Sequence, residues 1–121
     1  MTLAEYNDFC AYLPHTTHVV QWGGSHVWKI GGKVFAIAGG NSDSDFRCSF
    51  KVSELAFDIL KEQPGCQGAP HLASRGMKWI QRFSDEAVDD DALRDYLRES
   101  YRLVSRGLTK KLQRELGLNQ S

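Results

Sequence analysis

The chain has 121 residues and carries 15 basic and 15 acidic side chains, so its formal net charge at neutral pH is zero. Hydrophobic residues make up 41% of it and charged residues 25%, which excludes the disordered, collagenous and coiled-coil classes. No apolar run approaches the roughly 20 residues of a membrane span, and the N-terminus lacks a signal-peptide pattern. We therefore expect one domain over residues 1–121, cytoplasmic, monomeric and not bound to a membrane.

The cysteines and the distribution of charge refine this expectation. Cys10, Cys48 and Cys66 are scattered and odd in number, so no disulfide framework is indicated and a reducing compartment is favoured. The acidic stretch 85–99 lies between basic stretches at 71–84 and 100–121. These blocks are either solvated helix ends or a basic patch that meets an anionic partner. A pI near 6.9 argues against strong, salt-driven binding to DNA.

The N-terminal third predicts a helix followed by a strand. Thr2 and Glu5 have the spacing of a capping box, apolar residues recur at helical spacing over 3–13, and Pro14 ends the helix. A β-branched run then predicts a strand over 16–22, which the pair Gly23-Gly24 terminates.

Residues 27–38 give the clearest local signal, a tight β-hairpin. Gly31-Gly32 supplies the positive φ angles that a type I′ turn requires between strands 27–30 and 33–38. In the simplest register Trp28 lies opposite Phe35, on the core face with Ile30 and Ile37. The other face then carries Val27, Lys29, Val34 and Ala36.

The central region predicts a strand and then a helix. Residues 46–52 alternate, and the side chains expected to point inward are Phe46, Cys48, Phe50 and Val52. Ser53 is a plausible N-cap for a helix ending near Gln63. The apolar stripe expected on that helix consists of Leu55, Ala56, Ile59 and Leu60.

The C-terminal half predicts a loop, a strand and two helices. Residues 65–76 are rich in glycine and are expected to form a loop. In strand 77–84 we expect Met77, Trp79 and Phe83 on the core side and Lys78, Ile80 and Arg82 on the other. Apolar residues at helical spacing predict helices over about 90–106 and 109–116, separated at Gly107 with Thr109 as a new N-cap.

Together these elements predict an α+β fold with a single antiparallel β-sheet and helices packed on one face. Outward alternation would place five cations on the opposite face of the sheet: Lys29, Arg47, Lys51, Lys78 and Arg82.

The hairpin run 28–36 (WKIGGKVFA) resembles the V-x-K-V-G-G-K-x-F-A signature of the MmcQ/YjbR family. Further similarity lies at 13–14 (LP), 50–52 (FKV), His71, 78–80 (KWI), 100–101 (SY) and 108–112 (LTKKL), and segments 19–24 and 72–81 resemble a proteobacterial branch. This resemblance implies a CyaY-like fold and the DNA-binding label that members often carry, taken from a double-wing arrangement of hairpins in a related structure. The candidate nucleic-acid-binding residues are Lys29, Lys33, Arg47, Lys51, Arg75, Lys78 and Arg82.

No pattern in the sequence assembles a catalytic or metal site. His15 and His18 would point to opposite faces of a strand, and no closed zinc-ligand spacing is present. Cys48 between two phenylalanines would be an inert thiol, and neither a nucleophile motif nor a phosphate-binding glycine loop occurs. We therefore expect a non-catalytic domain without cofactor or metal.

The leading hypothesis is a weak, largely sequence-independent DNA-binding domain that uses a basic sheet face. Trp79 lies in sequence among Arg75, Lys78 and Arg82 and could stack on a base, but alternation places it on the core side. The alternative is a small-ligand or protein-interaction module with no nucleic-acid role. Its pocket would use the 65–76 loop, with His71, Trp79 and Tyr101.

Overall fold

The computed structural model describes residues 1–40 and 43–118 of the chain. In this part six strands form one antiparallel sheet with the order β1-β2-β3-β4-β6-β5. The strands are β1 (Thr16–Gln21), β2 (Ser25–Ile30), β3 (Lys33–Gly39), β4 (Arg47–Lys51), β5 (Cys66–Gly68) and β6 (Trp79–Arg82). The helices are α1 (Leu3–Tyr12), α2 (Glu54–Leu60), α3 (Asp90–Arg106) and α4 (Lys110–Leu116), with 3-10 turns η1 (Asp43–Asp45) and η2 (Ala73–Arg75).

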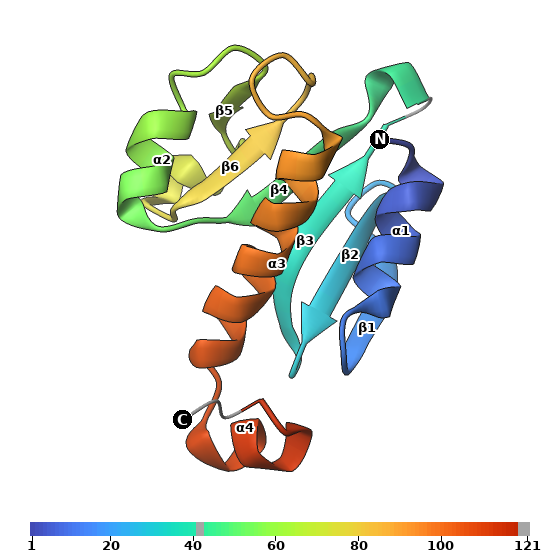
Figure 1. The fold of residues 1–121 in the computed structure, drawn as a ribbon, viewed down its shortest axis with the longest axis vertical. Coiled ribbons are helices and arrows are strands. Elements are labelled where there is room, and N and C mark those ends of the chain that lie inside the picture. Colours follow the sequence, from blue (N-terminus) through green and yellow to red (C-terminus); the bar gives the residue numbers. More distant parts are fainter. Residues whose placement is uncertain (41–42, 119–121) are drawn as a thin grey trace.

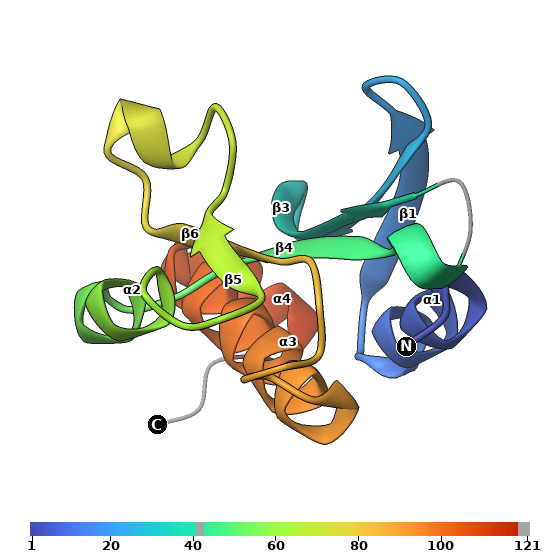
Figure 2. The ribbon, with the colours of Figure 1, turned by 90° about the horizontal axis from the view of Figure 1, so that it is seen from above.

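The helices lie on one side of the sheet, as the sequence predicts (Figures 1 and 2). Seen from above, α1, α2 and α3 lie below the strands, while the β1–β2 turn and the segment around η2 rise on the opposite side (Figure 2). The main core fills the layer between helices and sheet, with Tyr6, Phe35, Phe50, Leu93 and Leu97 fully buried. No helix among the described residues is long and apolar enough to cross a membrane.

The structure confirms three local features predicted from the sequence: a capping box, a hairpin turn and a helix N-cap. Thr2 and Glu5 make the capping box of α1, because the hydroxyl of Thr2 accepts from Glu5 N and the Glu5 carboxylate accepts from Thr2 N. Gly31 and Gly32 turn between β2 and β3 with φ angles of 60° and 81°. Thr109 caps α4 by accepting from Leu112 N at 3.1 Å, so the C-terminal helical region is two helices.

The register of the hairpin differs from the sequence-based prediction. A β-bulge next to Trp28 sets this residue opposite Ala36 instead of Phe35, while Lys29 still pairs with Val34. Phe35 and Ala36 consequently both face the core, and Ile37 moves to the other face. The prediction was wrong because one extra residue in a strand reverses the alternation beyond it.

A buried hydroxyl on α3 completes the hydrogen bonding at this bulge. The Ser100 hydroxyl donates to the carbonyl of Phe35 at 2.6 Å and accepts from the backbone N–H of Lys51 at 2.9 Å. Ser100 is fully buried, and the β3–β4 ladder pairs Ala36 with Phe50 before it ends. The serine therefore joins two strands through a helix at the place where their direct pairing stops.

The faces of β6 are the reverse of those predicted. Ile80 pairs with Phe50 and belongs to the main core, and Arg82 is 3% exposed on the same face. Trp79 pairs with Lys51 on the face without helices, where it is nevertheless 5% exposed. The backbone N–H of Ala69 bonds to the Trp79 carbonyl, and the segment from Ala69 to Lys78 rises on that face, which accounts for the burial of the indole (Figure 2).

Two further predictions need correction. Residues 66–68 form the short edge strand β5 against β6, although their glycine-rich surroundings predict a loop. On α2, Leu55 is 71% and Ile59 is 52% exposed, whereas Ala56, Phe57 and Leu60 pack on the core. The helix covers only the β5–β6 end of the sheet, so a narrower stripe than predicted is buried.

Candidate functional site

Acidic residues lie on the helices and connecting segments, and not on the strands, of this fold. The six strands contain five basic residues, Lys29, Lys33, Arg47, Lys51 and Arg82, and no aspartate or glutamate. The helices, in contrast, carry carboxylates such as Glu54 on α2 and Asp90 and Asp91 on α3. On the sheet face without helices, the strands themselves therefore contribute basic side chains and no carboxylate, and Asp45, in the turn before β4, lies beside Arg47. We call this surface, on the side of Ile37, Arg47, Ser49, Lys51 and Gln81, the open face.

The strand registers place one row of side chains across the whole open face. Directly paired residues in an antiparallel sheet point to the same side, so the row follows from the pairings alone. Its members, from β1 to β5, are Val19, Val27, Ile37, Ser49, Gln81 and Gln67. The row is apolar on β1, β2 and β3 and polar on β4, β6 and β5. Arg47 and Lys51 stand on either side of Ser49 along β4 and add positive charge to the polar half.

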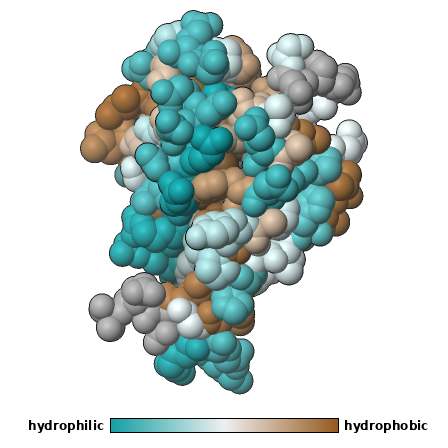
Figure 3. All heavy atoms as spheres, turned by 45° about the vertical axis from the view of Figure 1, so that its right-hand side comes forward, coloured by the Kyte–Doolittle hydropathy of each residue, from teal (hydrophilic) through white to brown (hydrophobic). Residues whose placement is uncertain are grey.

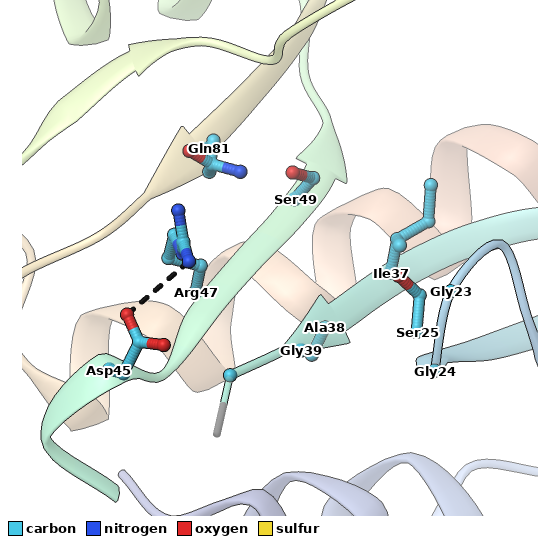
Figure 4. Close-up of a pocket in the computed structure, with 11 residues that line it drawn as sticks. Gly23, Gly24, Ser25, Ile37, Ala38, Gly39, Asp45, Arg47, Ser49 and Gln81 are labelled. Carbon is cyan, nitrogen blue, oxygen red and sulfur yellow. Dashed lines mark ion pairs between the residues drawn. The ribbon is translucent and has the colours of Figure 1, made fainter. Parts of the chain in front are cut away.

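A shallow groove of about 390 Å³ lies on this face between the β1–β2 turn and strand β6. Ile37, Ser49 and Gln81 form its floor, and Arg47 lies beside Gln81 (Figure 4). The Arg47 guanidinium makes an exposed ion pair with Asp45 at 3.3 Å. A second hollow of about 340 Å³ shares Asp45, Arg47 and Gln81 and extends the groove to Gln67, whose amide donates to Gln81 Oε1 at 2.7 Å.

Two projecting segments border the open face. The β1–β2 turn contains Trp22, which is 62% exposed and has a φ of 53°, an unusual value for a residue other than glycine. On the other side rises the 69–78 segment with η2 and the exposed Arg75 (Figure 2). Phe83, just after β6, is 44% exposed and borders the second hollow. Phe83 thus lies at one end of the polar groove, and Trp22 directly precedes Gly23 and Gly24, which line its other end.

The structure groups some of the predicted cations and separates others. Lys29, Arg47 and Lys51 lie on the open face, and Arg75 lies on the segment beside it. Lys33 begins β3 at the hairpin turn and donates to the carbonyl of Gly107 at 3.2 Å, next to the end of α3. These positions leave three of the five expected cations on one sheet face.

Lys78 and Arg82 lie on the helix-covered side, so the prediction of a common face was wrong for both. The Lys78 ammonium sits 4.9 Å from the ring centre of Phe57 on α2. The Arg82 guanidinium donates to the Val88 carbonyl and to Asp90, both at 2.9 Å. Its role is to connect β6 to the start of α3, because its donors are occupied inside the fold.

The residues of the alternative pocket do not come together. Trp79 is buried beneath the 69–78 segment, and His71 is exposed on that segment with a φ of 68°. Tyr101 lies on α3, across the sheet, where its ring meets Phe35 edge-on and its hydroxyl donates to the Pro14 carbonyl at 2.6 Å. It borders a separate cavity near the C-terminal helices.

The cysteines and histidines outside the open face do not form a metal site among the described residues. Burial raises the pKa of the Cys48 thiol to about 12 and also raises the pKa values of the Cys10 and Cys66 thiols, which disfavours the thiolate. His18 Nε2 and His26 Nδ1 are 3.0 Å apart beside α1, a contact that sequence spacing did not predict. Within the described residues, no group of three or more His, Cys, Asp or Glu side chains is arranged to hold a metal ion.

The polar side chains of the two hollows are not among the site residues predicted from the sequence. Ser49, Gln67 and Gln81 come from three strands and meet only through non-local pairing. The available signal was their alternation with inward residues, such as Cys48 and Phe50 around Ser49.

The fold defines a small α+β domain with one antiparallel sheet covered by helices on one face. The family model described as YjbR matches residues 11–103, and the chain belongs to the YjbR family. The chain is similar to the crystal structure of Deinococcus radiodurans protein DR2400, of domain family DUF419, with a TM-score of 0.81 and 26% identity over 99% of this chain and 91% of that one. A Pseudomonas syringae protein shares the fold with a TM-score of 0.67 and 18% identity, over 85% of this chain and 98% of that one. No curated protein matches significantly.

Proposed function

We propose that this protein is a non-catalytic domain that binds nucleic acid weakly, and with little sequence preference, through the open face of its sheet. The observation that carries the proposal is the absence of carboxylates from all six strands, combined with Lys29, Arg47 and Lys51 on the face that no helix covers. Phosphate contacts by basic side chains supply sequence-independent affinity. The zero net charge of the chain keeps that affinity modest.

The shape and chemistry of the groove support the same class of ligand. Trp22 and Phe83 are exposed aromatic residues on which bases could stack, and stacking tolerates any base. Ser49, Gln67 and Gln81 can exchange hydrogen bonds with sugar and base edges. Arg47 can leave Asp45 for a phosphate at low cost, since an exposed ion pair contributes about 1 kcal/mol or less.

The test is a fluorescence anisotropy titration with a labelled 20-base-pair DNA duplex and its single strand, repeated at several salt concentrations. Three phosphate contacts give a slope of about −2.7 in log K against log salt for the duplex. Lys51→Gln and Arg47→Gln should each reduce the steepness of that slope by about 0.9.

Lys111→Gln on α4 is the matched control, because it removes one exposed positive charge from the helix side of the molecule. It should leave the slope unchanged. Absence of binding at low salt, or equal slopes for the control and the two open-face variants, would reject the proposal.

A further inference from the structure

A further hollow lies away from the open face, where the end of α1 meets α3 and α4. It has a volume of about 610 Å³, within the range of small-molecule sites. Pro14 and His15 border it at the end of α1, Tyr101 and Arg106 on α3, and Lys110 on α4. We call it the C-terminal cavity. The function proposed above does not use it.

The charged side chains that line the C-terminal cavity are all basic. Arg102, Arg106 and Lys110 line it together with His15, and no carboxylate is among the lining residues. Arg102 is paired with Glu99, whose lowered pKa also reflects the charge of Arg106, and neither Arg106 nor Lys110 makes an ion pair with any described residue. Both are exposed, so their charged ends are available to a ligand. The basic excess that the sequence shows over residues 100–121 is thus partly concentrated around one hollow.

Two leucines give the cavity an apolar wall, and hydrogen bonds of Gln113 lie beside it. Leu116 and Leu118 line it, and Leu118 is held back against α4 because its N–H donates to the Gln113 carbonyl at 2.8 Å. Gln113 is 6% exposed, and its side-chain amide donates hydrogen bonds to the carbonyls of Arg106 and Leu108. Its Oε1 accepts no hydrogen bond from the described residues. Hydrophobic atoms also reach the surface around α4, at the lower end of Figure 3.

The rim carries backbone strain of the kind found near binding sites. His15 has a φ of 63°, although it is not glycine, and the segment beside it is fixed by the hydrogen bond from Tyr101 to Pro14. The Ser105 hydroxyl is 7% exposed and donates to the Tyr101 carbonyl at 2.7 Å. Tyr101 and Ser105 are therefore already held in place by hydrogen bonds within the fold, which lowers the entropic cost of ordering this part of the rim on binding.

We infer that the C-terminal cavity binds a small organic anion with an apolar arm, such as a medium-chain carboxylate. Arg106 and Lys110 would hold the anionic head, and Leu116 and Leu118 would cover the arm. A purely inorganic anion would leave the apolar wall uncovered, and a neutral apolar molecule would leave the two cations without a partner.

The probe for this inference is 1-anilinonaphthalene-8-sulfonate, an aromatic anion that fluoresces when it leaves water. Neutral N-phenyl-1-naphthylamine has a similar apolar body without the charge. We expect the sulfonate to bind the parent protein and octanoate to displace it at lower concentration than inorganic phosphate. Equal affinity for the neutral probe, or equal displacement by phosphate and octanoate, would overturn the inference.

Two double variants test whether the fluorescence reports this cavity. Arg106→Gln with Lys110→Gln should weaken binding of the sulfonate about tenfold or more, because two charge-assisted contacts are lost. Lys111→Gln with Arg114→Gln removes the same charge from α4 outside the cavity lining and should change binding by about twofold or less. All four positions are exposed, so thermal melts should coincide. Equal weakening in both variants would place the probe elsewhere.

An acyl anion can be free or part of a lipid, and the structure favours a free ligand because the site is a hollow. Sedimentation with phosphatidylglycerol-containing vesicles distinguishes these sources. We expect the protein to remain in the supernatant. Pelleting of the parent and the Lys111/Arg114 variant, but not of the Arg106/Lys110 variant, would contradict a free ligand.

Discussion

The two faces of the sheet share every strand but are built for different tasks. On the helix-covered face, alternate residues such as Cys48, Phe50 and Ile80 are fully buried, and even Arg82 has its donors occupied. On the open face, their immediate neighbours Arg47 and Lys51 are exposed, and Arg47 lines a groove together with the less exposed Ser49. The comparison teaches that a cation on a strand is informative only after its face is known. Arg82 is bonded inside the fold, whereas Arg47 and Lys51 are exposed, with Arg47 in a surface ion pair with Asp45.

The sharpest way to break this comparison is to truncate neighbouring residues of β4. Phe50→Ala removes a fully buried ring from the core and should lower the free energy of unfolding by about 3–5 kcal/mol. Ser49→Ala, on the open face, should change it by about 1 kcal/mol or less. Urea denaturation of both variants measures the difference. Similar losses of unfolding free energy would mean that Ser49 on the open face contributes as much to stability as Phe50 in the core.

The hairpin turn offers a second contrast, because its two glycines face different surroundings. A Cβ atom on Gly31 would lie 2.7 Å from a methyl of Leu108, whereas one on Gly32 would meet nothing within 4 Å. Valine at either position is strained by the positive φ, at about 1–2 kcal/mol. Gly31→Val must also displace Leu108 and should cost about 3 kcal/mol in total. Thermal melts in which Gly32→Val is the more damaging change would contradict the packing of the turn against the α3–α4 junction.

The buried Ser100 hydroxyl, on the helix side of the sheet, should also contribute to the free energy of unfolding. Ser100→Ala leaves the Phe35 carbonyl and the Lys51 N–H without their buried partner and should cost about 2 kcal/mol. Ser105→Ala, one turn further along α3, removes a hydroxyl bonded only to its own helix and should cost less than half as much. Chemical denaturation compares them, and equal values would remove the role assigned to Ser100 at the bulge.

The smallest effect concerns the carboxylate that meets Arg82. A hydrogen bond from the N-terminal ammonium, and then one from Arg82, lower the pKa of Asp90 below its ordinary 3.8. A lowered pKa in the folded state stabilises the protein above pH 3.8, and this contribution disappears as the pH falls through the folded value. Because Asp90 is 40% exposed, it amounts to about 1 kcal/mol or less. The stability difference between the parent and Asp90→Asn should therefore shrink between pH 5 and 2; a constant difference would contradict the ion pair.

The sequence predicts those parts of the fold that short segments determine by themselves. The capping box at Thr2 and Glu5, the Gly31-Gly32 turn and the new helix start at Thr109 each depend on a few adjacent residues. The bulge beside Trp28 was not predictable in this way, because it depends on how β3 meets the helix carrying Ser100.

The candidate site was predicted only in part, for a physical reason that β6 illustrates. Hydropathy alone places Trp79 inside and Arg82 outside, yet the 69–78 segment covers the indole and Asp90 pairs with the guanidinium. Both partners lie just outside the strand, before Trp79 and after Arg82, so the alternation of residues within the strand does not reveal them. The cations of β4, in contrast, were placed correctly, since Phe50 and Cys48 on the same strand fix their direction.

The most direct test of the open face as a nucleic-acid interface is an NMR titration of ¹⁵N-labelled protein with a short DNA strand at low salt. We expect amide shifts to change for Arg47, Ser49, Lys51 and Gln81 and in the β1–β2 turn at Gly23 and Gly24. Amides of α3 and α4 should remain in place. Shift changes concentrated on those helices, with the strands β4 and β6 unaffected, would contradict the central claim.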